Sequence, residues 1–333
     1  MKRYFWKLCL FFFLIPISAI SSAEAYSKYL DDYKYPFNVL NMSFVSQGQN
    51  LSMAYMHLPA QEDKPTVLLL HGKNFAGSYW ETTANWLHKQ GYGVVIPDQV
   101  GFGKSSKPVN YQYSFAALAN NTRMLLSLLD LDNVIVTGHS MGGMLASRFA
   151  LLFPEMTSKL ILINPIGLEN YLHYVEYKDV EFFYQNELEK TPDNIVSYQK
   201  KNYYDGDWNS TYAKHASFLT GWIEGDDWPQ LAKVSALTYD MIFTQPVIEE
   251  FDDFQMPVTL ILGTRDRTGP GRGWKKEGVT RELGRYDKLG AEVKARNSAI
   301  TVKELSGLGH LPQIEAFSRF TPVYSQALKP DEN

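Results

Sequence analysis

The stretch "NVIVTGHSMGGMLASRFALL", residues 133–152, predicts a buried strand, a sharp turn at Ser140 and then a helix. Gly138 and Gly142 lie two residues before and two residues after the serine. Side chains at these positions would collide with neighbouring backbone in a sharp strand-to-helix turn. The pattern therefore predicts a nucleophile elbow, in which Gly138, His139 and Gly142 surround a nucleophilic Ser140. The alternative, a glycine-rich turn with an incidental serine, is less favoured because a strand and a helix flank the turn.

The N-terminus has the pattern of a cleaved export signal. Basic residues precede an apolar run of 13 residues at positions 8–20, and small residues follow at Ala23 and Ala25. The run is shorter than the roughly 20 apolar residues that cross a membrane. We therefore expect a signal peptide at residues 1–25, cleavage near Ala25 in preference to an uncleaved anchor, and a periplasmic or secreted protein without a stable membrane anchor.

Composition excludes several classes of function. Loss of residues 1–25 would change the formal net charge from −4 to −6, because three basic residues and Glu24 leave, and this charge disfavours nucleic acid as a partner. Cys9 is the single cysteine of the chain and would leave with the signal, which excludes thiol catalysis and cysteine-held metals. No histidine and carboxylate cluster has metal-ligand spacing, so we expect no metal and no cofactor.

The strand and helix pattern predicts an α/β fold. Two paired strands are expected at 37–45 and 51–59, and a strand buried on both faces at 66–72. Helix-like and strand-like runs then alternate, with further strands expected at 91–98, 133–138, 159–165, 257–263 and 299–307, and helices at 77–90, 114–131 and 141–154. Strict alternation implies a mostly parallel, doubly wound sheet with helices on both faces.

The alternation stops between the strands expected at 159–165 and 257–263. Residues 168–250 are helix-like, acidic and rich in tyrosine and tryptophan. We expect this segment to be a helical cap over the carboxyl edge of the sheet, where open α/β sheets bind ligands. The expected domains are a core in two parts, residues 26–167 and 251–333, and a cap at 168–250.

A serine nucleophile needs a base and an acid that orients the base. In enzymes with this elbow the acid and then the histidine follow the serine along the chain. His310, in "GLGHLPQIEAF" after the last expected strand, is the candidate base, and Asp266, in "TRDRTGPG" after the strand before it, is the candidate acid. Asp98 is a rival carboxylate, but it precedes Ser140. The alternatives for His310 and Asp266 are a surface histidine and a surface aspartate paired with its neighbouring arginines.

Two backbone N–H groups should stabilise the oxyanion of a tetrahedral intermediate. One candidate is the amide of Met141, at the start of the helix after the serine. The other is the amide of Lys73, which follows the strand and "HG" at 71–72.

Four segments, "LLLHGKNFAGSYW", "PDQVGFGKSSKP", "GHSMGGM" and "GLGHLPQIEAF", together resemble the α/β-hydrolase superfamily, in the branch with a helical cap. The branch includes epoxide hydrolases, haloalkane dehalogenases, carbon–carbon bond hydrolases and many esterases. The resemblance runs from Phe37 to Leu328. The first two groups attack with an aspartate where this chain has Ser140, so the resemblance implies acyl chemistry. One departure is the separation of 44 residues between Asp266 and His310, with a charged stretch at 271–296.

The sequence thus predicts an exported serine hydrolase, a carboxylesterase acting on a small or medium ester. A carbon–carbon bond hydrolase and an aminopeptidase of the proline iminopeptidase type, whose acidic cap would hold a substrate amino group, are the alternative enzymes. A non-catalytic ligand-binding homologue is the alternative of another class. The partner is expected to be a small acyl substrate.

Overall fold

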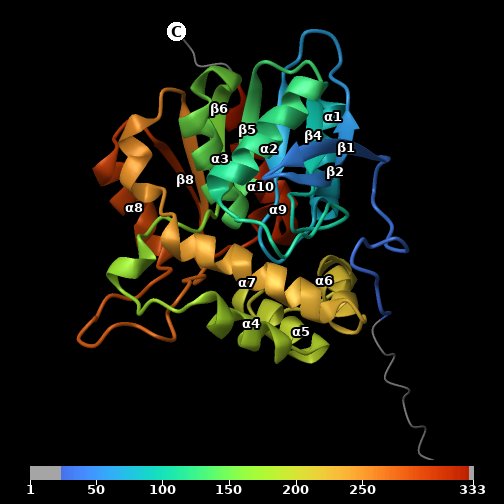
Figure 1. Ribbon diagram of the computed structural model, residues 1–333. Helices are drawn as coiled ribbons and strands as arrows, with labels where there is room; N and C mark the ends of the chain where they lie inside the picture. The colour runs from blue at the N-terminus through green and yellow to red at the C-terminus, as the bar shows by residue number, and fades with distance from the viewer. Residues whose placement is uncertain (1–23, 330–333) are drawn as a thin grey trace, which may run out of the picture.

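The computed structural model describes residues 24–329, so the export signal expected at 1–25 falls almost entirely outside the described residues. Its centre is an eight-stranded sheet in the order β1-β2-β4-β3-β5-β6-β7-β8 (Figure 1). Strands β3 to β8 are parallel to one another, while β2 pairs antiparallel with β1 and β4. The strands are β1 (Val39–Ser46), β2 (Gln49–Leu58), β3 (Thr66–Leu70), β4 (Gly93–Pro97), β5 (Val134–His139), β6 (Thr157–Ile163), β7 (Val258–Gly263) and β8 (Thr301–Leu305).

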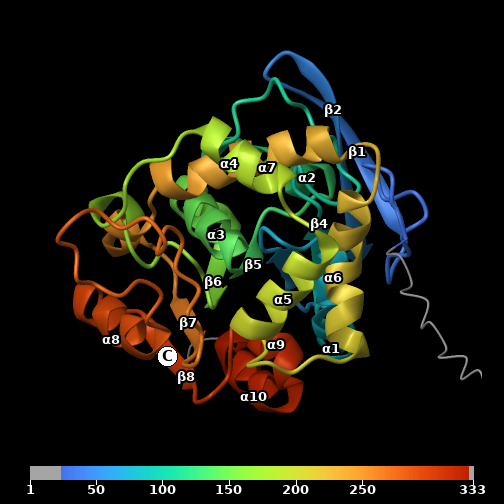
Figure 2. The ribbon, with the colours of Figure 1, turned by 90° about the horizontal axis from the view of Figure 1, so that it is seen from below.

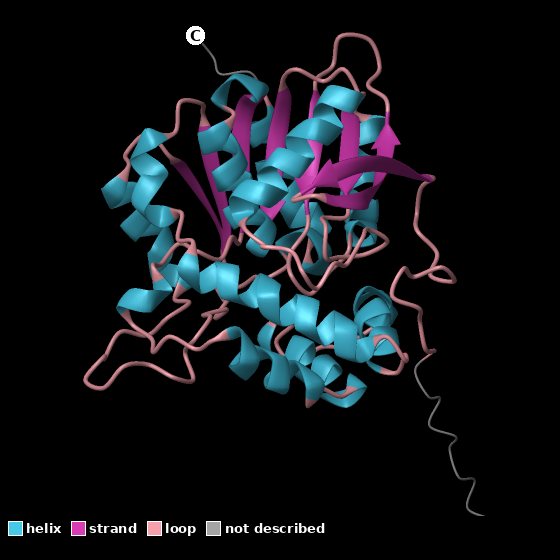
Figure 3. Cartoon of the chain, viewed as in Figure 1, coloured by secondary structure: helices cyan, strands magenta, loops and turns pink. Residues whose placement is uncertain are grey.

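Helices cover both faces of this sheet, which confirms the predicted fold class (Figure 3). The helices of the core are η1 (Gly77–Trp80), α1 (Glu81–Lys89), α2 (Phe115–Leu128), α3 (Met141–Leu152), η2 (Pro154–Met156), α8 (Tyr286–Arg296), α9 (Pro312–Glu315) and α10 (Phe317–Leu328). Helix α8 lies within the charged stretch 271–296, where the sequence pattern gave no expectation of a helix. Its buried face is small, because Tyr286, Leu289 and Val293 are its large apolar residues that are buried.

The alternation of side chains along β3 divides the core into two layers. Leu68 and Leu70 belong to the apolar cluster that α2, α3 and α8 complete. Val67 and Leu69 point to the opposite face, where they join the cluster completed by α1 and α10. Because successive strand residues point to opposite faces, an unbroken apolar run such as "TVLLL" fits a strand that is covered on both sides.

The chain between β6 and β7 is helical. It forms η3 (Tyr171–His173), α4 (Val180–Leu188), α5 (Pro192–Asn202), α6 (Ser210–Ile223), α7 (Trp228–Thr244) and η4 (Ile248–Asp253). Helices α4 to α7 lie together below the sheet in Figure 1, and Figure 2 shows them from their own side. The aromatic residues of α6 and α7 pack on the segment that precedes β1, as the hydrogen bond from Trp222 Nε1 to the carbonyl oxygen of Ser27 illustrates (3.0 Å). No helix among residues 24–329 has the length and apolar character to cross a membrane.

The carboxylate of Asp98, at the carboxyl end of β4, forms hydrogen bonds with three separate segments. It accepts hydrogen bonds from the amide of Gly77 (2.6 Å), the amide of Lys104 (2.8 Å) and the hydroxyl of Tyr35 (2.6 Å). The residue is 1% exposed. Asp98 therefore fixes the start of η1, the loop after β4 and the segment that leads into β1.

Replacing Asp98 with alanine should lower the free energy of unfolding by about 2–4 kcal/mol, because one buried and two part-buried donors lose their acceptor. Urea denaturation followed by circular dichroism measures this change. The exposed Asp63 provides the control, since Asp63→Ala should change stability by less than about 0.5 kcal/mol. Equal effects of the two substitutions would contradict the assignment.

Candidate active site

Ser140 occupies the turn between β5 and α3 in a strained backbone conformation. Its φ is 56° and its ψ is −123°, outside the regions that residues with a side chain normally adopt. Hydrogen bonds hold the turn, from the Ser140 amide to the carbonyl oxygen of Ile163 (3.2 Å) and from the Gly143 amide to the carbonyl oxygen of Ser140 (2.9 Å). Such strain persists only where the surroundings enforce it, and it is typical of functional sites.

The glycines on either side of Ser140 are required by close backbone approach. A Cβ atom added to Gly138 would lie 2.6 Å from the carbonyl carbon of Gly142, and one added to Gly142 would lie 2.6 Å from the carbonyl oxygen of His71. Backbone cannot yield as the end of a flexible side chain can. The turn is therefore compatible with glycine alone at both positions.

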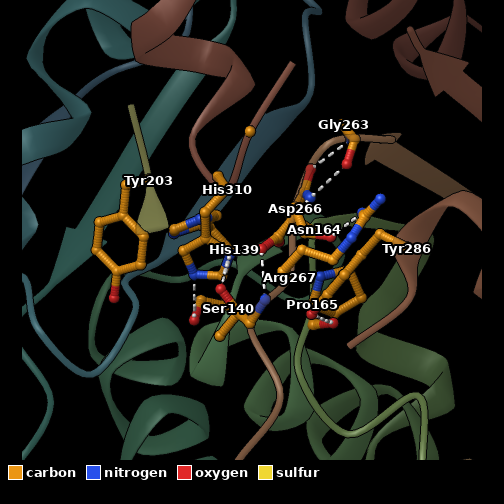
Figure 4. A network of polar contacts seen from close by, with 12 residues as sticks. His139, Ser140, Asn164, Pro165, Tyr203, Gly263, Asp266, Arg267, Tyr286 and His310 are labelled. Atoms are coloured by element: carbon orange, nitrogen blue, oxygen red, sulfur yellow. Dashed lines mark hydrogen bonds and ion pairs between the residues drawn. The ribbon is translucent and has the colours of Figure 1, made fainter. Parts of the chain in front are cut away.

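The structure brings Ser140, His310 and Asp266 into one hydrogen-bonded chain (Figure 4). Nε2 of His310 lies 3.0 Å from Oγ of Ser140, and Nδ1 of His310 lies 2.6 Å from Oδ2 of Asp266. With a proton on Nδ1, the imidazole donates to the carboxylate and its Nε2 accepts from the serine hydroxyl. Ser140 is 7% exposed, and the other two residues are fully buried.

Neighbouring strand ends hold the Asp266 carboxylate. Nδ2 of Asn164, directly after β6, donates to Oδ2 (2.9 Å), and the amide of Thr268 donates to Oδ1 (2.8 Å). Burial by itself would raise the pKa of Asp266, but the charge of His310 and the hydrogen bonds from His310 and Thr268 outweigh burial and lower that pKa below its ordinary value. The carboxylate is therefore ionised at neutral pH.

Two further rings contact the imidazole of His310. Tyr203, at the end of α5, stacks on it with ring centroids 4.8 Å apart and an interplanar angle of 26°. The ring of His139 also lies 4.8 Å away, and its Nε2 is 2.8 Å from the carbonyl oxygen of His310. Burial, followed by the charge of His310, lowers the pKa of His139 well below its ordinary value. His139 is therefore neutral, with its proton on the Nε2 that donates to this carbonyl group.

Ion pairs and a hydrogen bond connect the end of α5 to the loop that carries Asp266. Arg265 binds Asp205 (3.4 Å) and also Glu315 of α9 (2.6 Å). Arg272 donates to the side-chain oxygen of Asn202 (2.8 Å). The segment around Tyr203 is thus tied to the loops of both the acid and the histidine.

The two expected oxyanion donors belong to segments next to Ser140. Met141 is the first residue of α3, and the first amides of a helix have no acceptor within that helix. Lys73 directly follows Gly72, and a Cβ added to Gly72 would lie 3.1 Å from Cβ of Ser140. The loop after β3 therefore approaches the serine closely.

Sequence reasoning did not identify Asn164 and Tyr203 as parts of this site. Asn164 could have been found, because it directly follows the strand beside the one that precedes Asp266. Tyr203 gave no such signal, because it is one of many aromatic residues between β6 and β7 and lies far from His310 in the sequence. Within residues 24–329 no cluster of three or more histidine, cysteine or acidic side chains could hold a metal ion.

The fold and the site together define a class. Residues 65–276 match the family described as the alpha/beta hydrolase fold, and the chain belongs to this family.

Several known proteins are similar to this chain. A solved structure, a probable hydrolytic enzyme from Pseudomonas aeruginosa, is 42% identical with a TM-score of 0.90, and the match covers 93% of this chain and 100% of that one. An uncharacterized protein of Mycobacterium tuberculosis is 41% identical over 107 residues, 31% of this chain and 30% of its own length. A 2-hydroxy-6-oxononadienedioate/2-hydroxy-6-oxononatrienedioate hydrolase of Comamonas testosteroni is 33% identical over 127 residues, 37% of this chain and 44% of its own. The matches to these two curated relatives thus span less than half of their lengths.

Substituting Gly138 with alanine should destabilise the protein by about 3 kcal/mol or more, because the added methyl group meets backbone. Gly273→Ala is the matched control, since a Cβ at Gly273 would have no atom within 4 Å. Thermal unfolding of both variants measures the difference. A stable Gly138→Ala variant with an unchanged midpoint would contradict the steric argument.

Asp266→Asn should lower the free energy of unfolding by about 2 kcal/mol at neutral pH. The folded pKa of Asp266 lies below the ordinary value of 3.8, so its carboxylate contributes stability that is fully present above that value and is lost as the pH falls through the folded pKa. The difference between wild type and variant should be constant from about pH 6 to 8 and shrink below about pH 4. Denaturant titrations at several pH values test this, and a difference that grows on acidification would refute it.

Proposed function

We propose that this protein is a serine hydrolase that cleaves small or medium carboxylic esters through an acyl-enzyme on Ser140. The observation that carries the proposal is the unbroken hydrogen-bonded chain from Oγ of Ser140 through His310 to Asp266. The strained serine turn and the ionised buried acid add to it, because both belong to the machinery of nucleophilic acyl transfer.

The proposed reaction has two steps. Oγ of Ser140 attacks the ester carbonyl carbon while Nε2 of His310 takes the proton of the serine hydroxyl. The carbon–oxygen bond to the alcohol then breaks, and His310 gives this proton to the leaving alcohol. Water attacks the acyl-enzyme in the same manner and releases the acid. Asp266 stabilises the imidazolium that forms in each step, and Tyr203 offers its ring face to the same cation.

The amides of Met141 and Lys73 are the proposed oxyanion donors. Met141 begins α3 directly after Ser140, and Gly72, directly before Lys73, lies against the serine. Donors held on such backbone would need little reorganisation as charge develops on the carbonyl oxygen. We propose that helices α4 to α7 act as the cap that excludes water from this step, in keeping with the small exposure of Ser140.

Two other enzymatic activities remain as alternatives with unequal support. Similarity to the carbon–carbon bond hydrolase of Comamonas testosteroni favours carbon–carbon bond cleavage as the second candidate. An aminopeptidase would need a free carboxylate for the substrate amino group. The buried carboxylate of the inserted helices, Glu187, is instead paired with Lys190 (2.7 Å), which argues against that activity.

The purified protein should hydrolyse p-nitrophenyl butyrate and react with a fluorophosphonate probe at Ser140. Ser140→Ala should abolish labelling and lower kcat by at least about 10³-fold, because nucleophile removal in a serine enzyme costs this much or more. Ser147→Ala is the matched control in α3, since its hydroxyl donates to the carbonyl of Gly143, and it should retain activity. Folded protein that neither labels nor turns over esters would overturn the proposal and favour a ligand-binding homologue.

A further inference from the structure

Lys73 has a second feature besides its backbone amide. Its side chain crosses from the loop after β3 to helix α7, where Nζ lies 2.6 Å from Oγ and 3.0 Å from the carbonyl oxygen of Ser235. The ammonium group also lies 4.8 Å from the ring centroid of Tyr239. A positive charge is thus held two residues after His71, in the loop that approaches Ser140.

This charge has no carboxylate of its own. Of residues 24–329, none places a carboxylate within ion-pair distance of Lys73. Glu187 of α4 acts on it at longer range, but that carboxylate already forms an ion pair with Lys190 (2.7 Å) and is itself buried. Two ammonium groups therefore share one carboxylate where α4 packs beside α7 (Figure 1).

Burial lowers the pKa of Lys73 to about 8, and the attraction of Glu187 opposes this effect. Lys73 therefore remains mostly protonated at neutral pH. A partly buried cation without a full counter-charge is costly, and an anion that arrives beside it would recover part of that cost.

The space beside these charges is a cavity of about 30 Å³ between the core loops and the inserted helices. Lys73, Glu187, Lys190 and Ser235 line its polar side. The remaining walls are mainly apolar, with Phe102 from the loop after β4 and Trp222 and Trp228 from the inserted helices. This volume is about that of one water molecule, so the cavity can hold the end of a carboxylate beside Lys73, while the rest of a substrate would lie outside it.

We propose that Lys73 is the specificity-determining residue of this enzyme and that the substrate is an ester carrying a carboxylate, which the Lys73 ammonium binds. This inference rests on the proposed ester hydrolysis at Ser140. The carboxylate adds the missing negative charge to the cluster of two lysines and one glutamate. Gly72, directly before Lys73, lies against Ser140, so an ester at the serine can reach the ammonium group with its other end.

The first test compares pairs of esters of similar size, in which one member carries a carboxylate and the other is neutral. The half-ester p-nitrophenyl hydrogen glutarate and the neutral p-nitrophenyl pentanoate carry the charge difference on the acyl side; 4-acetoxybenzoate and its methyl ester carry it on the alcohol side. The wild-type kcat/KM should favour the anionic member of at least one pair by about tenfold or more, as expected for a charge-assisted contact. Equal or lower kcat/KM for the anionic member in both pairs would overturn the inference.

Two substitutions should move this preference in opposite directions. Lys73→Met keeps the backbone amide and removes the charge, so the ratio of anionic to neutral kcat/KM should fall about tenfold. Glu187→Gln removes the nearby negative charge, so the ratio should rise about threefold. Glu189→Gln, at an exposed position just after α4, is the control and should leave the ratio unchanged. If the Lys73 side chain only connected the β3 loop to α7, Lys73→Met would change kcat/KM for both members of a pair alike. This result would also overturn the inference.

A binding measurement separates failure of this inference from failure of the proposed function. Calorimetric titration of Ser140→Ala with monomethyl glutarate and with methyl pentanoate needs no turnover. Tighter binding of the half-ester, lost on adding Lys73→Met, supports the carboxylate site even if hydrolysis is not observed. Equal binding of the two compounds rejects the site, while labelling of wild-type Ser140 and turnover of neutral esters would leave the esterase proposal standing.

Discussion

The close backbone approach around Ser140 is the constraint on which the site depends. Positions 138 and 142 accept no side chain. A side chain at position 138 would collide with the carbonyl group of Gly142, and one at position 142 would collide with the carbonyl group of His71. This contact forces Ser140 to a positive φ, which points its hydroxyl out of the turn toward His310. The loop after β3 also lies close to the turn, because Gly72 contacts Ser140. The backbone amide and the side-chain charge of Lys73 are therefore at the same edge of the sheet as the serine.

The acid and the histidine reach the serine because parallel strands end at a common edge. Asp266 follows β7 and His310 follows the adjacent β8, while Asn164 follows β6 and binds the acid. Each of these loops is fixed by more than its own strand. Arg265 joins the acid loop to α9, and Tyr203 covers the imidazole from the inserted helices (Figure 4). The positions of the proposed catalytic groups are therefore determined by several independent contacts.

The inserted helices contribute side chains to the site. Tyr203 supplies a ring face to His310, and Ser235 and Glu187 set the surroundings of the Lys73 ammonium. In the proposed function the core thus supplies the acyl-transfer chemistry, and the contacts between Lys73 and the inserted helices select the substrate. Changes in these helices would then alter specificity without altering the order of Ser140, Asp266 and His310.

The sequence by itself determined the features that depend on local patterns. The apolar runs gave the strands, their alternation with helices gave the sheet, and the glycines around Ser140 gave the turn, because each is a steric or burial requirement expressed within a few residues. It also placed Asp266 and His310 after successive strands. Only the tertiary structure decided which distant side chains meet them. The stacking of Tyr203 on His310 and the contact of the Lys73 ammonium with Ser235 of α7 depend on the packing of helices and loops, which no local periodicity encodes.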